Sequence, residues 1–224
     1  MESEFISTMV LTFKLASITT VILLLIAIPL AWVLAFSNIR FKSIIETIVS
    51  MPLVLPPSVL GFYLLLGFSP SSGIGSFLID HGIRLAFSFE GLVVGSILFS
   101  LPFMVHPIQA ALTQVPRSII EASYTLGKSP FVTALRVVLP SIRHGLISGV
   151  VLAFAHTIGE FGVILMIGGN IPGETRVASI AIYDEVESLN YALAHQYALT
   201  LFAITFAILL LVYTLNKKSL SSLR

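Results

Sequence analysis

"MVLTFKLASITTVILLLIAIPLAWVLAF", residues 9–36, is a long apolar stretch with a single charged residue, Lys14. A helix needs about 20 mostly apolar residues to cross the roughly 30 Å hydrocarbon core of a bilayer. The stretch is continuously apolar and does not alternate, so a strand is a poor interpretation. Because lipid cannot satisfy backbone polar groups, such a stretch forms a helix that satisfies its own. It therefore predicts a transmembrane helix.

The composition of the whole chain extends this prediction. Of the 224 residues, 56% are hydrophobic and only 10% are charged, and the mean hydropathy is +1.01. Soluble domains carry about 25% charged residues. The chain is therefore predicted to be an integral, all-α membrane protein. It contains no cysteine, which excludes disulfides, thiolate zinc sites and cysteine nucleophiles.

Apolar stretches of spanning length recur along the chain and predict a polytopic protein with about five transmembrane helices. They cover residues 9–36, 47–68, 90–112, 145–168 and 197–215. Residues 113–144 form a long polar loop between the third and fourth spans, and residues 69–89 and 169–196 form the segments on the other side. No second domain is evident outside residues 10–215.

Basic residues are concentrated on one side of the predicted spans. Nine of the 12 Lys and Arg residues fall on that side: Arg40, Lys42, Arg117, Lys128, Arg136, Arg143, Lys217, Lys218 and Arg224. Lysine and arginine accumulate in cytoplasmic loops. This asymmetry predicts an N-terminus outside, a C-terminus inside and a cytoplasmic 113–144 loop.

The loop contains "LGKSPFVTALRVVLP", residues 126–140, whose Gly-Lys-Ser matches the end of a phosphate-binding loop. That motif requires another glycine five positions before Gly127, where this chain has Ala122. It also requires a buried strand before the loop, and none is predicted. The stretch therefore does not predict a nucleotide site in this chain.

The same loop has the signals of two short helices. Ser118 and Glu121 predict a capping box, and Gly127 predicts a helix end with positive φ. Pro130 is placed to begin a second helix. Pro140 is expected to mark the turn back into the membrane. The pair is either a surface that binds a partner or an interfacial loop without one.

Several positions in this loop resemble the EAA signature of ABC importer permeases. The matching residues are Glu121, Ala122, Ser123, Gly127, Val137, Leu139 and Pro140. Every spacing agrees, with Ser123 in place of an alanine and Val137 in place of an isoleucine. The resemblance implies that residues around 121–130 form a coupling helix, which docks into a groove of a separate ATPase subunit.

Two further stretches are similar to the membrane subunit of molybdate importers: "MPLVLPPSVLGFYLL" at 51–65, and "GEFG" at 159–162 followed by "NIPGETR" at 170–176. The resemblance implies a type I permease domain over residues 10–215 in a prokaryotic inner membrane. The implied partners are a second copy of the chain, two ATP-binding cassette subunits and an extracytoplasmic oxyanion-binding protein, with no nucleic acid. ATP is then bound by the partner, and this chain holds no cofactor. Molybdate is the implied substrate, with tungstate and sulfate left open.

Prolines within the second span predict a break in its helix. Pro56 and Pro57 each remove a backbone donor, and Ser58 follows them directly. Broken backbone at membrane depth occurs only against protein or a water-lined cavity. The break therefore either lines the translocation path or only shapes the packing. Ser100, in the third span, is a candidate for the same path.

His156 and Glu160 are four residues apart in the fourth predicted span, hence on one helix face. Ionisable residues inside a membrane are candidates for function. The two form either a structural pair or part of an outer gate, and a carboxylate is a poor ligand for an oxyanion. They are also the one acid–base pair that an intramembrane enzyme could use. A membrane scaffold that transports nothing is the remaining alternative, and no metal-ligand spacing is present.

Overall fold

The computed structural model describes residues 2–37 and 39–221, and this part of the chain is helical and contains no strand. In chain order the elements are α1 (Glu2–Phe36), α2 (Lys42–Ser50), η1 (Met51–Leu53), α3 (Pro57–Phe68), α4 (Gly73–Asp80), α5 (Phe89–Thr113), α6 (Arg117–Thr125), α7 (Pro130–Thr133), η2 (Ala134–Val138), α8 (Leu139–Ser141), α9 (Arg143–Gly159), α10 (Gly162–Gly168), α11 (Ala178–Glu187) and α12 (Tyr191–Ser221). The predicted all-α, multi-pass fold is confirmed.

Three described helices are long and apolar enough to cross a membrane unbroken: Ser3–Phe36, Phe89–Thr113 and Tyr191–Leu210. In two further cases, a pair of consecutive helices is long and apolar enough to cross a membrane only when the two helices are counted together. Lys42–Leu53 and Pro57–Phe68 meet at 109°, and Pro130–Ser141 and Arg143–Gly159 meet at 73°. The described chain therefore has up to five spans, of which two are bent.

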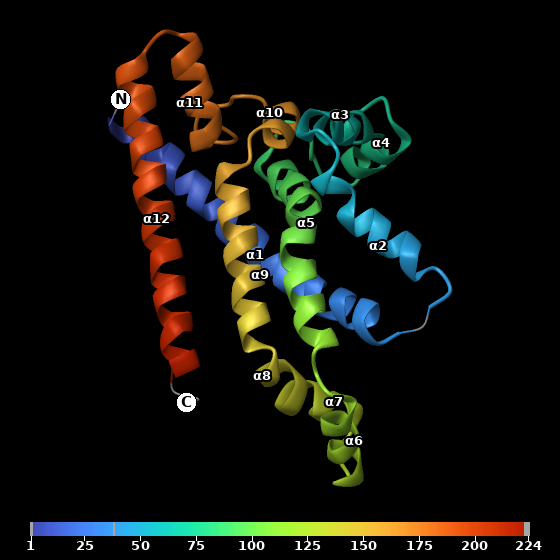
Figure 1. Ribbon diagram of the computed structural model, residues 1–224. Helices are drawn as coiled ribbons and strands as arrows, with labels where there is room; N and C mark the ends of the chain where they lie inside the picture. The colour runs from blue at the N-terminus through green and yellow to red at the C-terminus, as the bar shows by residue number, and fades with distance from the viewer. Residues whose placement is uncertain (1, 38, 222–224) are drawn as a thin grey trace.

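Helix α5 lies at the centre of the molecule, with α1 and α9 packed on it (Figure 1). The largest buried cluster joins these three helices through residues such as Ala27, Met104, Ile108 and Ala153. Small residues let α9 approach α5 closely. A Cβ added at Gly145 would lie 2.4 Å from the Ala111 Cβ, so any side chain there would force the helices apart.

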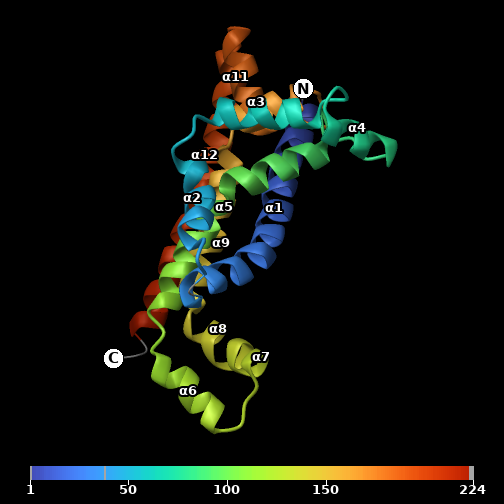
Figure 2. The ribbon, with the colours of Figure 1, turned by 90° about the vertical axis from the view of Figure 1, so that its right-hand side faces the viewer.

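The predicted break in the second span is confirmed. Pro56 is extended, with ψ 134°, and Pro57 is the first residue of α3. Residues 47–68 are consequently not one straight helix. Figure 2 shows α2 running beside α5 while α3 lies crosswise at the end of the molecule that holds the N-terminus.

The fourth predicted span, 145–168, is interrupted too. Helix α9 ends at Gly159, Glu160 is extended with ψ 133°, and α10 begins at Gly162. Figure 1 shows α10 beside α3, and contacts between these two helices are extensive. The outer parts of the two interrupted spans therefore pack on each other.

The two ends of the molecule differ as the charge asymmetry predicts. The start of α1 lies at the same end as α3, α4 and α11, whereas α6 and α7 project from the opposite end (Figure 1). Helix α12 runs from the first end towards the second. By the distribution of basic residues, the N-terminal end is assigned to the outside and the α6–α7 end to the cytoplasm.

Candidate functional site

Helix α6 does not begin with the predicted capping box. It starts at Arg117 after the extended residue Pro116, and no side chain caps it. Ser118 is already inside the first turn. The sequence-based prediction was wrong because Pro116 itself ends the extended segment, so the helix begins one residue before Ser118 can act as its cap.

The predicted end of α6 at Gly127 is confirmed. Gly127 has φ +74°, and its N–H donates to the Tyr124 carbonyl at 2.9 Å. The Lys128 N–H donates to the Ser123 carbonyl at 3.1 Å, which completes a Schellman motif. A Cβ at Gly127 would meet no atom within 4 Å, so the backbone conformation, and not the available space, requires glycine here.

Two hydroxyl groups connect α6 to the following helix. The Ser123 and Thr133 oxygens lie 2.8 Å apart, and both residues are buried. Ser129 accepts a hydrogen bond from the Val132 N–H at 3.3 Å and so caps α7, which begins at Pro130 as predicted. The turn is therefore stabilised by the hydrogen bond between Ser123 and Thr133, by the bonds that end α6 and by the cap that begins α7.

The outward side of this helix pair is apolar. Leu126 is 77% exposed and Phe131 is 72% exposed, and Ile119, Tyr124 and Leu135 are exposed around them. Glu121 and Ala122 are also exposed. A groove of about 400 Å³ runs between α6 and η2, lined by Ser118, Ile119, Ala122, Ser123, Leu126, Lys128 and Val137. An exposed apolar patch with a groove is typical of a protein interface.

Pro140 does not mark the turn into the membrane, contrary to the prediction. The backbone stays helical from Pro130 to Ser141, and the 73° bend falls after Ser141, at Ile142. A π-helical segment, Ala134–Val138, precedes the proline. A wider turn relieves the clash between a proline ring and the preceding carbonyls. Leu139 is half-buried and Pro140 is exposed.

The breaks in the second and fourth spans meet at one cavity of about 570 Å³. It is lined by Pro57, Ser58, Phe99, Ala155, His156, Gly159, Glu160, Phe161 and Gly162. The contact between the breaks is close, because a Cβ at Gly162 would lie 2.7 Å from the Pro57 Cβ. The structure therefore brings together the predicted candidates Pro57, Ser58 and Glu160, and Pro56 immediately precedes them.

His156 pairs with Ser100 and not with Glu160. The Ser100 hydroxyl lies 2.9 Å from His156 Nδ1 and 3.0 Å from the Thr157 hydroxyl. The His156 ring stacks on Phe103, with ring centroids 3.9 Å apart. The predicted shared face fails because α9 ends at Gly159, before the turn that would have aligned Glu160 with His156. The acid–base pair required for an intramembrane enzyme is therefore not formed.

Glu160 is 3% exposed, and neither carboxylate oxygen has a hydrogen-bond partner in the described chain. The Ser96 hydroxyl lies close enough to interact with it, but without hydrogen-bond geometry, and is itself unpaired. The Glu160 backbone carbonyl accepts a bond from the Ser179 hydroxyl at 2.6 Å, which ties the break to α11. No group of three or more potential metal ligands was found among residues 2–37 and 39–221.

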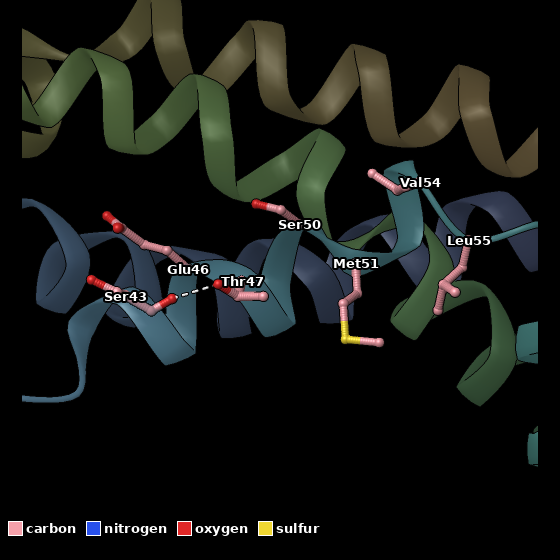
Figure 3. A pocket seen from close by; sticks show the side chains of 7 residues that line it. All are labelled: Ser43, Glu46, Thr47, Ser50, Met51, Val54 and Leu55. Atoms are coloured by element: carbon pink, nitrogen blue, oxygen red, sulfur yellow. Dashed lines mark hydrogen bonds between the residues drawn. The ribbon is translucent and has the colours of Figure 1, made fainter.

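A polar face on α2 was missed by the sequence interpretation. Ser43, Glu46, Thr47 and Ser50 line a cavity of about 510 Å³ together with Met51, Val54 and Leu55 (Figure 3). Glu46 accepts a hydrogen bond from the Gln109 amide at 3.0 Å, and Ser50 lies 3.2 Å from His106 Nε2. The spacing i, i+3, i+4, i+7 of the four polar residues was the available signal.

At the outer end, Arg176 joins three acidic side chains. Its guanidinium lies 2.9 Å from Glu4, 2.9 Å from Asp184 and 3.0 Å from Glu185. These contacts connect the start of α1 to α11 and to the turn that precedes it. The outer segment 169–196 is therefore an ordered surface anchored to the first span.

Comparisons with known proteins agree with this architecture. Residues 27–220 match the family model described as binding-protein-dependent transport system inner membrane component. The molybdenum transport system permease protein ModB of Azotobacter vinelandii is 46% identical over 205 residues, which cover 91% of each chain. A probable sulfate transport system permease protein, cysT of Zygnema circumcarinatum, is 33% identical over 212 residues, covering 94% of this chain and 74% of that one.

The fold itself has close counterparts among solved structures. A chain of the inward-facing MetNI methionine ABC transporter superposes with a TM-score of 0.75 at 15% identity, covering 97% of both chains. At that identity the likeness concerns the fold alone. The family match spans most of the sequence, and the relatives match along nearly the whole chain. The chain therefore belongs to the family of binding-protein-dependent transport system inner membrane components.

Proposed function

We propose that this chain is the permease subunit of an ATP-driven importer that moves molybdate into the cytoplasm. The observation that carries the proposal is the 46% identity to a molybdenum transport permease over 91% of both chains. Permeases named for sulfate are less similar, at 33% identity for the relative described above. The chain performs no covalent chemistry in this proposal, and a separate partner subunit binds and hydrolyses ATP.

The α6–α7 pair is the proposed coupling element. Glu121, Ala122 and Gly127 lie on an exposed element with an apolar patch centred on Leu126 and Phe131, and this exposure supports docking to an ATPase subunit. Ser123 acts from the inside by holding α6 to α7. Leu139 and Pro140 lie in the helical segment that leads from this element to α9.

The proposed mechanism is transport by alternating access. ATP draws the two ATPase subunits together, the coupling elements follow, and the spans change from inward-facing to outward-facing; hydrolysis resets them. Up to five spans are few to enclose a path, which favours a homodimer with the path between the copies. The cavity at the two breaks, with Pro56, Pro57, Ser58, Glu160 and the nearby Ser100, is the proposed outer part of that path. The outer segments 69–89 and 169–196 then receive the binding protein.

Reconstituted uptake tests the proposal directly. The chain is placed in liposomes with its ATPase subunit and binding protein, and ATP-dependent uptake of molybdate, tungstate and sulfate is measured. We expect molybdate uptake at low concentration, with sulfate excluded. A preference for sulfate would reassign the substrate. Absence of uptake of any oxyanion by an assembled, ATP-hydrolysing complex would overturn the proposal.

A further inference from the structure

Helix α2 presents three different faces: one is buried in the core, one is apolar and exposed, and one is polar and only partly covered by α5. Val49 is 2% exposed and packs in the large core cluster, with Ile45 beside it. Ile44 and Ile48 are 55% and 59% exposed and form a second, apolar face suited to lipid. The third face is the stripe of Ser43, Glu46, Thr47 and Ser50 that lines the cavity in Figure 3.

A polar stripe in a spanning helix has few places to lie. Polar and ionisable side chains at membrane depth face protein or a water-filled cavity, because lipid offers no partner. The stripe begins at the cytoplasmic end of α2 and extends into the membrane. At 1.5 Å per residue, Ser50 lies about 12 Å beyond Lys42 along the helix axis. Ser43 and Thr47 are exposed in the single chain. The Thr47 hydroxyl already donates to the Ser43 carbonyl at 2.7 Å, so Glu46 is the residue that requires protein or water on this face, because it is ionisable and lines the same cavity.

Polar residues of α5 support the stripe from behind. Gln109 donates to Glu46, and His106 lies within hydrogen-bond distance of Ser50, so the middle of the stripe and its Ser50 end are fixed in register with α5. Further along α5, Ser100 lies 2.9 Å from His156 of α9, and this pair continues the polar side chains towards the cavity at the two breaks. The polar groups thus extend from the inner part of the molecule to the predicted outer path.

The charges along α2 have a direction. Glu46 lies deeper in the span, and Lys42 and Arg40 lie at its cytoplasmic end. An anion beside the stripe is repelled by the carboxylate and attracted towards the two bases, and this field favours movement to the cytoplasm. Such effects are strong where water is restricted and are weakened by salt.

We propose that the polar stripe of α2 lines the inner section of the translocation path and that Glu46 makes this section release oxyanions to the cytoplasm. The proposal rests on the oxyanion-importer function proposed above. In this proposal, Glu46 promotes release of the transported anion, although an acidic residue would not be expected to bind that anion. A carboxylate is a poor ligand for a dianion and for that reason is suited to an exit.

The absence of cysteine makes the placement of the stripe directly testable. Thr47→Cys and Ile48→Cys each introduce a single thiol at neighbouring exposed positions of one helix, the first on the stripe and the second on the apolar face. The assembled transporter without ATP is treated with an uncharged, water-soluble maleimide. We expect Thr47→Cys to react about tenfold or more faster, because thiols react as thiolates in water. Equal rates, or faster reaction of Ile48→Cys, would overturn the placement.

The role of Glu46 is tested by oxyanion protection of the same thiol. Molybdate, tungstate and sulfate are added from the cytoplasmic side to Thr47→Cys, with and without Glu46→Gln, and the half-protecting concentration is measured relative to each unprotected rate. We expect Glu46→Gln to lower the half-protecting concentration about threefold or more, because the substitution removes the charge that repels the anion. The effect should be smaller at about 0.5 M salt, which screens that repulsion. Glu46→Asp and the distant control Glu90→Gln should leave it unchanged.

Adding charge provides the opposite test and an alternative if Glu46→Gln fails to assemble. Ser43→Asp places a second carboxylate on the stripe and should raise the half-protecting concentration. An unchanged concentration in both Glu46→Gln and Ser43→Asp would overturn the role of Glu46. Because protection needs neither ATP nor a chosen substrate, it remains informative if the uptake experiment excludes molybdate transport.

Discussion

Among the described residues, Glu160 is the acidic side chain whose two oxygens are both buried without a hydrogen-bond partner. It is buried at a helix break, with no hydrogen-bond partner for either carboxylate oxygen. An ionised carboxylate in such surroundings is costly, whereas a neutral group of the same shape costs far less. The residue therefore contributes by its size and by its place at the break, and the negative charge is not what the fold requires.

Replacement of Glu160 by glutamine should consequently be tolerated. We expect Glu160→Gln to retain the thermal stability of the detergent-solubilised complex or to raise it, and to retain uptake. Glu160→Ala leaves a cavity and should cost about 2–3 kcal/mol. Thermal unfolding of the three proteins measures this. If Glu160→Asp preserved function while Glu160→Gln abolished it, an ionised carboxylate would be required and this interpretation would be wrong.

Gly127 is constrained by its backbone conformation alone, since a Cβ there would meet open space. A β-branched residue at positive φ costs about 1–2 kcal/mol, whereas asparagine tolerates this region. We therefore expect Gly127→Val to disturb the α6–α7 turn and to lower ATPase-coupled uptake strongly, with Gly127→Asn close to wild type. Gly67→Ala, at an open helical position of α3, is the control. Full uptake by Gly127→Val would remove the coupling role of this turn.

At the scale of the element, α3 and α10 form a close-packed pair. A Cβ at Gly61 would lie 2.8 Å from the Met166 Cβ and 3.0 Å from the Val163 Cα. The two helices follow the breaks of different spans, yet they are held together as tightly as parts of one element. They are therefore expected to move as one unit during transport.

A larger side chain between α3 and α10 should separate them. We expect Gly61→Val to destabilise the protein by about 1–3 kcal/mol through overpacking and to reduce uptake. The ATPase activity of the assembled complex should persist, because the proposed coupling element, α6–α7, is at the other end of the molecule. Thermal unfolding and paired ATPase and uptake assays measure both effects. Unchanged stability would show that the α3–α10 contact is looser than described.

The elements also show how far the sequence could predict the structure. Spans such as α1 and α5 follow from composition, and the turn at Gly127 follows from one residue's conformational freedom. The directions of the bends could not be predicted from the sequence. Pro56 and Pro57 predict a break, but the 109° angle depends on packing against α10. The pairing of His156 was mispredicted because glycine at 159 is as compatible with close helix approach as with a helix end, so the sequence did not decide between them. The only sequence signal for the polar face of α2 was the helical spacing of its four polar residues.

At the scale of the whole molecule, Arg176 joins segments that are far apart in sequence. It binds Glu4, which is 172 residues away, and the two acids of α11. The arginine side chain is 11% exposed, and removing one partner from such a contact is costly because it leaves charges uncompensated. The contact therefore fastens the outer surface to the start of the first span.

Loss of this contact should loosen the outer end. We expect Arg176→Gln to cost about 1–3 kcal/mol and to weaken binding-protein-stimulated ATPase activity, with Arg176→Lys intermediate because lysine cannot contact several carboxylates in one plane. The unfolding midpoint and the stimulation by the binding protein are measured together. The exposed base Arg84, changed to glutamine, is the control for the unfolding midpoint. Equal behaviour of Arg176→Gln and the control would contradict this role.

The exposed apolar patch centred on Leu126 and Phe131 has a consequence for the steady-state amount of this protein in a cell. If the proposed ATPase partner is missing when the chain is synthesised, this apolar patch faces water, where such surfaces attract chaperones, proteases and other unfolded chains. Supply of the partner should then set the steady-state level of the membrane subunit. Balanced subunit numbers would arise from the chemistry of two side chains without a dedicated regulator.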